Sequence, residues 1–353
     1  MGRLGRLEGR VPKIAAVLVH YHAAELAGRA CDALLHGARA DGLELDLVVV
    51  DNGSTAAERA LLDRLPGRLL GAGASKGYAG GVNLGLRETE TEIAVVLNPD
   101  VFVRPGCLGA LVRAVQSGAA VAGPRFFWDL DRKLLLPPTE RVGRFEELLR
   151  VLAGRSPRWA RLARRRWRRH ARRHWQAREP FRSCDLSGAL LAVSRDAWRS
   201  VGSFDEGYRL YFEETDWLCR LRAAGLSALY VPGAEAIHLY AQSTSKEPRA
   251  EGWFLESSRR FRRRWYGPRY NSLLERLAAR RPPSPPVAAR RLDGSATWLE
   301  ISPSPLGFPA AGHLLESEVE PRLLDEIRQA VPAGQLFART VDPAGRELSF
   351  ASC

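Results

Sequence analysis

Apolar and polar residues alternate in blocks along the first third of the chain. Short apolar runs that predict strands are Ile14–His20, Leu45–Val50, Ile93–Leu97 and Ala119–Gly123. Helical periodicity lies between them: Leu26, Ala30, Leu34 and Leu35 share one face of the first helix, and later helices are predicted at Thr55–Leu65, Tyr78–Glu88 and Pro105–Ser117. This alternation predicts an α/β fold with a mostly parallel sheet and helices on both faces. The uninterrupted apolar strands agree, because parallel strands are buried on both sides.

The alternation breaks between residues 126 and 182, which contain the basic stretch RWARLARRRWRRHARRHWQAR. It resumes with a strand in 185–194, a helix through Trp198, a strand at Ser227–Val231 and a helix near Ala250–Tyr266. A proline-rich spacer, RRPPSPPVAARR, follows, and the tail has candidate elements at Trp298–Ile301, Pro321–Ala330 and Gln335–Val341. We therefore expect a tail at 1–12, an α/β domain at 13–270 with a basic insertion at 126–182, a Pro/Arg-rich linker at 271–294 and a small C-terminal α+β domain at 295–353.

The charge balance points to an anionic partner. The 353 residues carry a net charge of +13, which suits nucleic acid, phosphorylated small molecules or an anionic membrane surface. The five cysteines are widely spaced and form no C-x-x-C, which favours a reducing cytoplasm over a disulfide framework. The start of the chain lacks the apolar core of a secretory signal, and no apolar run approaches the roughly 18 residues of a spanning helix. We expect a cytoplasmic protein whose membrane contact is peripheral.

Polar residues follow two of the predicted strands. VVVDNGST places Asp51 at a strand end, where it either caps a turn or accepts hydrogen bonds from a nucleoside. LNPDVFV places Asn98 and Asp100 after the strand 93–97, at the sheet edge where open α/β proteins bind ligands. Their oxygens suit Mg²⁺ or Mn²⁺, provided that a substrate diphosphate supplies further ligands.

Two other stretches have unusual composition. SKGYAGGVNLGL, residues 75–86, puts costly glycines into a predicted helix, which indicates either close packing on the sheet or a ligand near the backbone. YFEETDWLCRLRAAG crowds Glu213, Glu214 and Asp216 into one helical turn. The helix dipole favours acidic residues there, but mutual repulsion also raises a pKa toward that of a general base. His238 ends another apolar run, and a lone histidine is more often structural than a ligand.

Taken in order, these motifs resemble family 2 glycosyltransferases, in particular bacterial rhamnosyltransferase-like members. The resemblance runs from the strand at Lys13–His20 through SGALLAVSRDAW and VGSFDE to IHLYAQS, over about residues 13–266 with a gap at the basic insertion. It implies a GT-A (Rossmann-like) fold, a nucleotide-sugar donor, a divalent cation, Mg²⁺ or Mn²⁺, and inversion at the anomeric carbon.

The resemblance also assigns residues. Asp100 stands where the family binds its metal, with Asn98 replacing the first Asp of D-x-D, and His238 stands where some members add a histidine ligand. Glu214 matches the catalytic base best, with Glu213 and Asp216 as further candidates. Donor binding is assigned to His20, Asp51, Gly53, Gly80, Gly81, Asn83 and Asn98.

The sequence alone leaves the substrates undecided and is compatible with other functions. The resemblance favours dTDP-rhamnose over a UDP-sugar as donor, and a cell-surface glycan or lipid-linked acceptor; the oligomeric state is left open. Trp159, Trp167 and Trp175 recur among arginines, which is typical of a helix lying on anionic lipid at the inner face of the plasma membrane, of a solvated basic helix, or of a nucleic-acid grip. No nucleic-acid motif is present, so no nucleic-acid partner is expected. The alternative functions are a nucleotidyltransferase of related topology and a basic adaptor protein.

Overall fold

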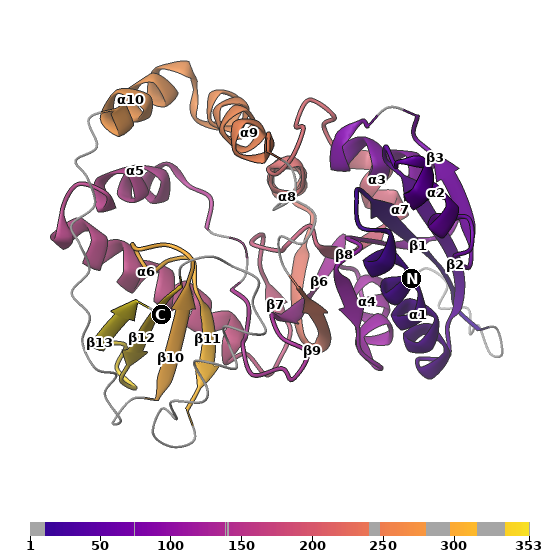
Figure 1. The fold of residues 1–353 in the computed structure, drawn as a ribbon, viewed down its shortest axis with the longest axis horizontal. Helices are drawn as coiled ribbons and strands as arrows, with labels where there is room; N and C mark the ends of the chain where they lie inside the picture. Colours follow the sequence, from indigo (N-terminus) through magenta and orange to yellow (C-terminus); the bar gives the residue numbers. More distant parts are fainter. Residues whose placement is uncertain are drawn as a thin grey trace, which may run out of the picture.

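The computed structural model describes residues 11–73, 75–137, 139, 141–239, 248–279, 297–315 and 336–352 (Figure 1). The predicted element at Pro321–Ala330 lies outside the described residues, and so does the predicted linker from residue 280 onward. The described residues form a large mixed sheet with helices on both faces and, beside it, a smaller antiparallel sheet built from the C-terminal segment.

The large sheet confirms the predicted α/β class. Its strand order is β3-β2-β1-β4-β8-β6-β9-β5, and β7 pairs with β9. Six of its nine described strands run in one direction; β5, β7 and β8 oppose them. The strands are β1 (Lys13–His20), β2 (Glu44–Asp51), β3 (Arg68–Gly71), β4 (Ile93–Leu97), β5 (Val101–Val103), β6 (Val121–Phe127), β7 (Phe181–Arg182), β8 (Leu190–Ser194) and β9 (Ala228–His238).

Two apolar cores lie on opposite faces of this sheet. One contains side chains of α1 (Ala24–Ala40) and α4 (Cys107–Gln116), and α2 (Ala56–Leu62) follows β2. The other contains side chains of α3 (Gly77–Arg87), α7 (Arg195–Val201) and α8 (Glu213–Ala223). Burial of strand side chains on both faces explains the continuous apolar runs in the sequence. The carboxyl ends of β1, β2 and β4 are left at one edge of the sheet, where they are joined by the beginning of β8.

The basic insertion forms two helices, α5 (Arg144–Ala153) and α6 (Pro157–Trp175). Figure 1 shows both beside the C-terminal sheet, whose order is β11-β10-β12-β13. Its strands are β10 (Trp298–Ser302), β11 (Ala311–Leu314), β12 (Phe337–Val341) and β13 (Glu347–Ser352). The helices α9 (Ala250–Tyr266) and α10 (Pro268–Ala279) complete the described structure, and α10 continues through the start of the predicted linker.

α6 packs one face onto the C-terminal sheet. The ring of Trp175 stacks on that of Trp298, with centroids 5.2 Å apart and planes at 21°. Arg168, which is 2% exposed, donates to both carboxylate oxygens of Glu300 at 2.5 and 2.8 Å. Trp167 is also buried, so most of the aromatic residues that suggested a lipid-facing helix are instead part of an intramolecular core. The sequence could not show this, because the partner strand lies more than 120 residues away.

Candidate active site

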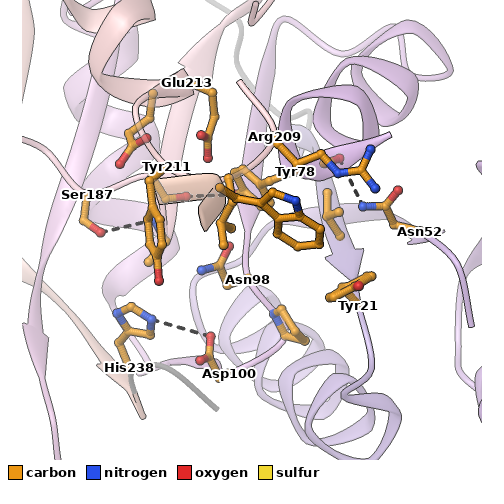
Figure 2. A pocket seen from close by; sticks show the side chains of 18 of the residues that line it. Tyr21, Asn52, Tyr78, Asn98, Asp100, Ser187, Arg209, Tyr211, Glu213 and His238 are labelled. Carbon is orange, nitrogen blue, oxygen red and sulfur yellow. Dashed lines mark hydrogen bonds and ion pairs between the residues drawn. The ribbon is translucent and has the colours of Figure 1, made fainter. Parts of the chain in front are cut away.

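Asp100 and His238 are brought together by strand pairing. After β4 ends at Leu97, the segment Asn98–Pro99–Asp100 turns the chain into β5, and β5 pairs antiparallel with the end of β9 so that Val101 faces His238. The backbone N–H of Leu239 donates to the carbonyl oxygen of Asp100 at 3.1 Å and fixes this register. The His238 Nε2 and Asp100 Oδ1 atoms are consequently 3.5 Å apart, and both side chains are buried (Figure 2).

Glu213 and Glu214 begin α8 after an unusual turn. Tyr211 and Phe212 both have left-handed backbone conformations, with φ of +64° and +70°, which are rare for aromatic residues. Such strained conformations cluster at functional sites, where the surrounding structure maintains them. Here Phe212 packs against Phe254 and Phe261, and the turn directs the first helical residues toward the sheet edge.

A pocket of about 260 Å³ joins these side chains at the sheet edge. Asn98, Asp100, Glu213, Glu214 and His238 all line it (Figure 2). Asp100 Oδ1, Glu213 Oε2 and Glu214 Oε2 are each inaccessible and accept no hydrogen bond. Buried carboxylate oxygens without donors are costly, so this cluster is suited to receive a cation or the hydroxyl groups of a substrate.

Glycine at position 188 allows the close approach of Glu214. A Cβ atom there would lie 3.0 Å from both Cβ and Cγ of Glu214, and the Gly188 carbonyl accepts a hydrogen bond from the Tyr78 hydroxyl at 2.8 Å. The close approach of Glu214 therefore explains the glycine of the SGALL motif at the start of β8. A larger residue would displace the carboxylate from the pocket.

The environment favours protonation of the paired glutamates. Burial and the neighbouring charge of Glu214 raise the pKa of Glu213 well above its ordinary value. Burial also raises the pKa of Glu214, and hydrogen bonds from backbone amides oppose the shift. Glu214 as a residue is partly exposed, but its Oε2 atom is not accessible to solvent. The carboxylate is therefore desolvated although the residue is not fully buried. A raised pKa is the property expected of a general base that must accept a proton and hold it.

A second cavity of about 630 Å³ opens on the other side of Glu214. The two cavities share the walls formed by Thr139, Ser187, Tyr211, Glu214 and His238. The remaining wall of the second cavity is largely apolar; it includes Phe126, Trp128 and Phe254 as well as Pro303, Pro309, Ala310 and Ala311 from the C-terminal segment. Glu214 thus lies where a small polar pocket meets a larger apolar one.

Three of the residues assigned to donor binding have structural partners at the end of β1 and β2. The His20 ring, fully buried, bonds to the Ala23 amide at 2.9 Å and to Ser54 Oγ at 3.1 Å. Asp51 Oδ1 accepts from the amides of Gly53 and Ser54, which is the turn-capping alternative left open by the sequence. Burial favours a higher Asp51 pKa, but these bonds and one from Arg59 lower it. Neither His20 nor Asp51 lines the pocket; their nucleoside role remains a prediction.

The helix glycines are closely packed. A Cβ at Gly81 would lie 2.5 Å from Val19 Cγ1 in β1, and one at Gly80 would lie 2.5 Å from Lys76 Cβ at the start of the same helix. Asn83 bonds to the backbone of Phe204, so it ties α3 to the loop before α8. None of the three lines the pocket; close helix–sheet packing accounts for Gly81, and the side chain of Lys76 at the start of the same helix accounts for Gly80.

Asp216 is also held outside the pocket. Its carboxylate accepts bonds from Arg220 Nε and Trp265 Nε1, both at 2.9 Å, and Arg264 Nε lies 3.2 Å away. These partners join α8 to α9 and leave no oxygen directed at the pocket. The geometry therefore favours the two glutamates over Asp216 as the base.

Sequence reasoning missed several residues that line the pocket: Tyr21, Asn52, Tyr78, Arg209 and Trp253 (Figure 2). Asn52 is the best placed for detection, since it follows Asp51 in the DNGS motif. Its side chain bonds to the Gly77 carbonyl and the Lys76 amide and holds the entry to α3 in place. Tyr78 lies in the SKGYAGGVNLGL stretch that the sequence analysis singled out, but only two of its glycines and Asn83 were assigned to donor binding.

The pocket fits a cation only in combination with a substrate. Among the described residues, no group of three or more His, Cys, Asp or Glu side chains could hold a metal ion. Asp100 and His238 offer one carboxylate and one imidazole, and burial lowers the pKa of His238, against the charge of Asp100, so the ring is neutral. Two protein ligands plus phosphate oxygens are a set that Mg²⁺ or Mn²⁺ accepts.

Comparisons with known proteins identify relatives of this chain. Residues 16–191 match the family model described as glycosyl transferase family 2, which includes Asp100 but ends before Glu213. The chain is 33% identical over 221 residues to an N-acetylglucosaminyl-diphospho-decaprenol L-rhamnosyltransferase of Mycobacterium tuberculosis, covering 58% of this chain and 69% of the relative. It is 35% identical over 77 residues to the rhamnosyltransferase WbbL of Escherichia coli, covering 21% and 29% of the two chains.

Among solved structures, the chain is similar to a mannosyltransferase of Pyrobaculum calidifontis in complex with GDP-Man and Mn²⁺. The TM-score is 0.47 at 16% identity, and the similarity covers 76% of this chain and 70% of the other. Within the part of the chain that the structure describes, no helix combines the length and hydrophobicity needed to cross a bilayer.

The raised pKa of Glu213 predicts a pH-dependent stability. Between the ordinary carboxyl pKa and the raised one, the folded protein binds a proton that the unfolded chain has lost, so the free energy of unfolding falls as the pH rises. Glu213→Gln removes this loss. We expect its melting temperature to equal that of the wild type near pH 4.5 and to exceed it by a few degrees at pH 8. Each kcal/mol gained in the free energy of unfolding raises the melting temperature by about 2–4 °C.

Thermal unfolding at the two pH values checks this expectation. Glu256→Gln, an exposed position on α9, is the matched control and should show no pH-dependent gain. A melting temperature of Glu213→Gln below that of the wild type at pH 8 would contradict the assignment of a destabilising buried carboxylate.

Proposed function

Because the chain belongs to glycosyl transferase family 2, and so is a glycosyltransferase, we propose that it transfers a sugar, with rhamnose favoured, from a nucleotide-diphosphate donor to a hydroxyl of a glycan or lipid-linked acceptor with inversion. The observation that carries the proposal is the pair of connected cavities with Glu214 between them. Family membership supports sugar transfer over the nucleotidyltransferase and adaptor alternatives.

The smaller pocket is the proposed donor site. It lies at the carboxyl ends of β1 and β4, the position at which open α/β sheets bind nucleotides, and Tyr21 and Trp253 provide apolar surfaces for a base or sugar. Asp100, with His238 beside it, would hold Mg²⁺ or Mn²⁺. The ion supplies charge neutralisation for the leaving diphosphate when bound.

Glu214 is the proposed base. Its carboxylate faces the donor pocket on one side and the larger cavity on the other, so an acceptor hydroxyl entering from the larger cavity meets it before the sugar. Glu214 removes the hydroxyl proton as the oxygen attacks the anomeric carbon from the face opposite the leaving diphosphate. A single displacement of this kind inverts the centre. The raised pKa lets Glu214 retain the proton until product leaves.

The relatives favour rhamnose and a lipid-linked acceptor. The mycobacterial relative is named for rhamnosyl transfer to N-acetylglucosaminyl-diphospho-decaprenol, and the second relative is named a rhamnosyltransferase. We extend these substrates to this chain as dTDP-rhamnose and a polyprenyl-linked sugar. The apolar wall of the larger cavity agrees with an amphiphilic acceptor.

Glu214→Gln is expected to lower kcat by about 10²–10⁴-fold, because the amide cannot accept the proton. Its affinity for the nucleotide diphosphate should stay within about twofold of wild type. Transfer from dTDP-rhamnose and calorimetric nucleotide binding measure the two quantities. Glu213→Gln, one residue earlier in the same turn, is the comparison: a greater loss of kcat there than in Glu214→Gln would move the base to Glu213.

Asp100→Ala is expected to remove the metal dependence of donor binding. In the wild type we expect Mn²⁺ to tighten binding of the nucleotide diphosphate by about 10-fold or more, equivalent to ~1.4 kcal/mol. The variant should bind with the same weak affinity in Mn²⁺ and in EDTA. Equal affinity of the wild type in both buffers would refute the role given to Asp100.

A face of the α5–α6 pair remains suited to contact anionic lipid. Phe145, Trp159 and Leu162 are 48%, 42% and 37% exposed, and Arg161 and Arg165 lie exposed on the same helix as the last two. Aromatic and aliphatic side chains among arginines are typical of interfacial helices. We propose that this face attaches the enzyme to the inner surface of the plasma membrane.

Trp159→Ser/Leu162→Ser is therefore expected to reduce co-flotation with vesicles containing anionic lipid several-fold at low salt. Leu61→Ser/Leu226→Ser, at equally exposed positions, should float like the wild type. If the wild type does not float with acidic vesicles, the membrane proposal fails.

A further inference from the structure

A third cavity, of about 270 Å³, lies between α5 and α6. Five arginines line it: Arg141 from the segment before α5, Arg150 from α5, and Arg166, Arg169 and Arg173 from α6. The three α6 positions are spaced by three and four residues and so share one helix face. Leu149, Trp167 and Phe308 give the cavity an apolar floor. Neither the sheet nor the pocket at its edge requires this arrangement.

Basic groups outnumber acidic ones among the residues that line this cavity. Five guanidinium groups and two carboxylates, Glu146 and Asp185, line it. Arg166 is committed to Glu146, with Nη2 2.5 Å from Oε1. Among the described residues, the side chains of Arg141, Arg169 and Arg173 make no hydrogen bond and no ion pair, although Arg173 lies over the Phe181 ring.

Concentrated like charge in a concave, partly apolar site is unfavourable without an anion. Burial and the charge of Arg262 lower the pKa of Arg150 to about 10, which shows how poorly this guanidinium is solvated. Guanidinium groups converging from separate elements match the several oxygens of a phosphate or diphosphate better than a single carboxylate. Arg161 and Arg165 on the same helix are also exposed but do not line this cavity.

The arginine cavity adjoins the larger cavity at Glu214. Arg141 and Arg150 line both cavities. Thr139, two residues before Arg141, lines both cavities at Glu214, and its carbonyl oxygen lies 3.1 Å from Nε2 of His170, which lines the arginine cavity. An acceptor that presents its hydroxyl at Glu214 therefore extends naturally toward the five arginines.

We propose that this arginine cavity, between α5 and α6, binds the phosphate or diphosphate through which the acceptor sugar is linked. The inference rests on the proposed function, since it deepens the acceptor side of the same site. The donor diphosphate has its own place at Asp100, on the far side of Glu214, and does not compete for the arginines. The acceptor is thus held at two points, its hydroxyl at the base and its anionic linkage at the basic insertion.

The test uses Arg169→Gln/Arg173→Gln, two exposed positions that line the cavity. Arg161→Gln/Arg165→Gln is the matched control, with the same charge change on the same helix outside the cavity. Binding of inorganic pyrophosphate and of geranyl diphosphate is measured by calorimetry in EDTA, which silences a metal-dependent donor site. We expect wild type and control to bind alike, and the cavity variant to bind about 30-fold more weakly.

If geranyl diphosphate binds more tightly than pyrophosphate, the ligand of the cavity is a lipid-linked diphosphate. If the two bind equally, the cavity recognises the diphosphate group alone. Both results support the proposed site. No binding of either probe by the wild type, or an equal loss in the two variants, overturns it. These measurements need no transfer and so stand apart from failure of the proposed function, which would appear as no reaction with any nucleotide sugar. In a transfer assay, the cavity variant should have a higher KM for the acceptor than the wild type, with the same kcat and the same KM for the donor. A higher KM for the donor instead would contradict the assignment.

Discussion

The antiparallel pairing of the three-residue strand β5 with the end of β9 is the constraint on which the site depends. Alignment of Val101 with His238 places the imidazole beside the carboxylate of Asp100, although 138 positions separate them in sequence. The same edge of the sheet receives the beginning of β8, where Gly188 leaves room for Glu214. The strand pairing thus fixes the position of Asp100 relative to His238, the residues proposed to hold the cation.

The site retains polar groups that the folded protein does not satisfy by itself. Carboxylate oxygens of Asp100, Glu213 and Glu214 are buried without donors, and two successive aromatic residues adopt left-handed conformations before α8. Each of these features opposes folding and is maintained by the packing of Phe212 and by the sheet. Their concentration around one pocket is more readily explained by ligand binding than by folding, because a protein selected for stability alone would avoid them.

The sequence predicted the sheet and its helices well but the site only in part. Apolar runs located β1, β2 and β4 almost to the residue, because burial on both faces leaves a clear pattern. The short strands β3, β5 and β7 have no such pattern and depend on neighbours distant in sequence. The resemblance favoured Glu214 but kept Glu213 and Asp216 as candidates, since the three share one helical turn, and the structure then showed that Asp216 does not line the pocket. Arg168 looked like part of a basic surface until its partner Glu300 was known.

The C-terminal sheet has a consequence for how such an enzyme diversifies. Pro303 and Pro309–Ala311 of the C-terminal segment line the larger cavity next to Glu214, while the described residues that line the smaller pocket lie between Val19 and Trp253. Under the roles proposed for the two cavities, substitutions at these C-terminal positions would alter the fit of the acceptor and leave the lining of the donor pocket intact. Part of the acceptor specificity could then diverge without any change in the residues proposed for catalysis.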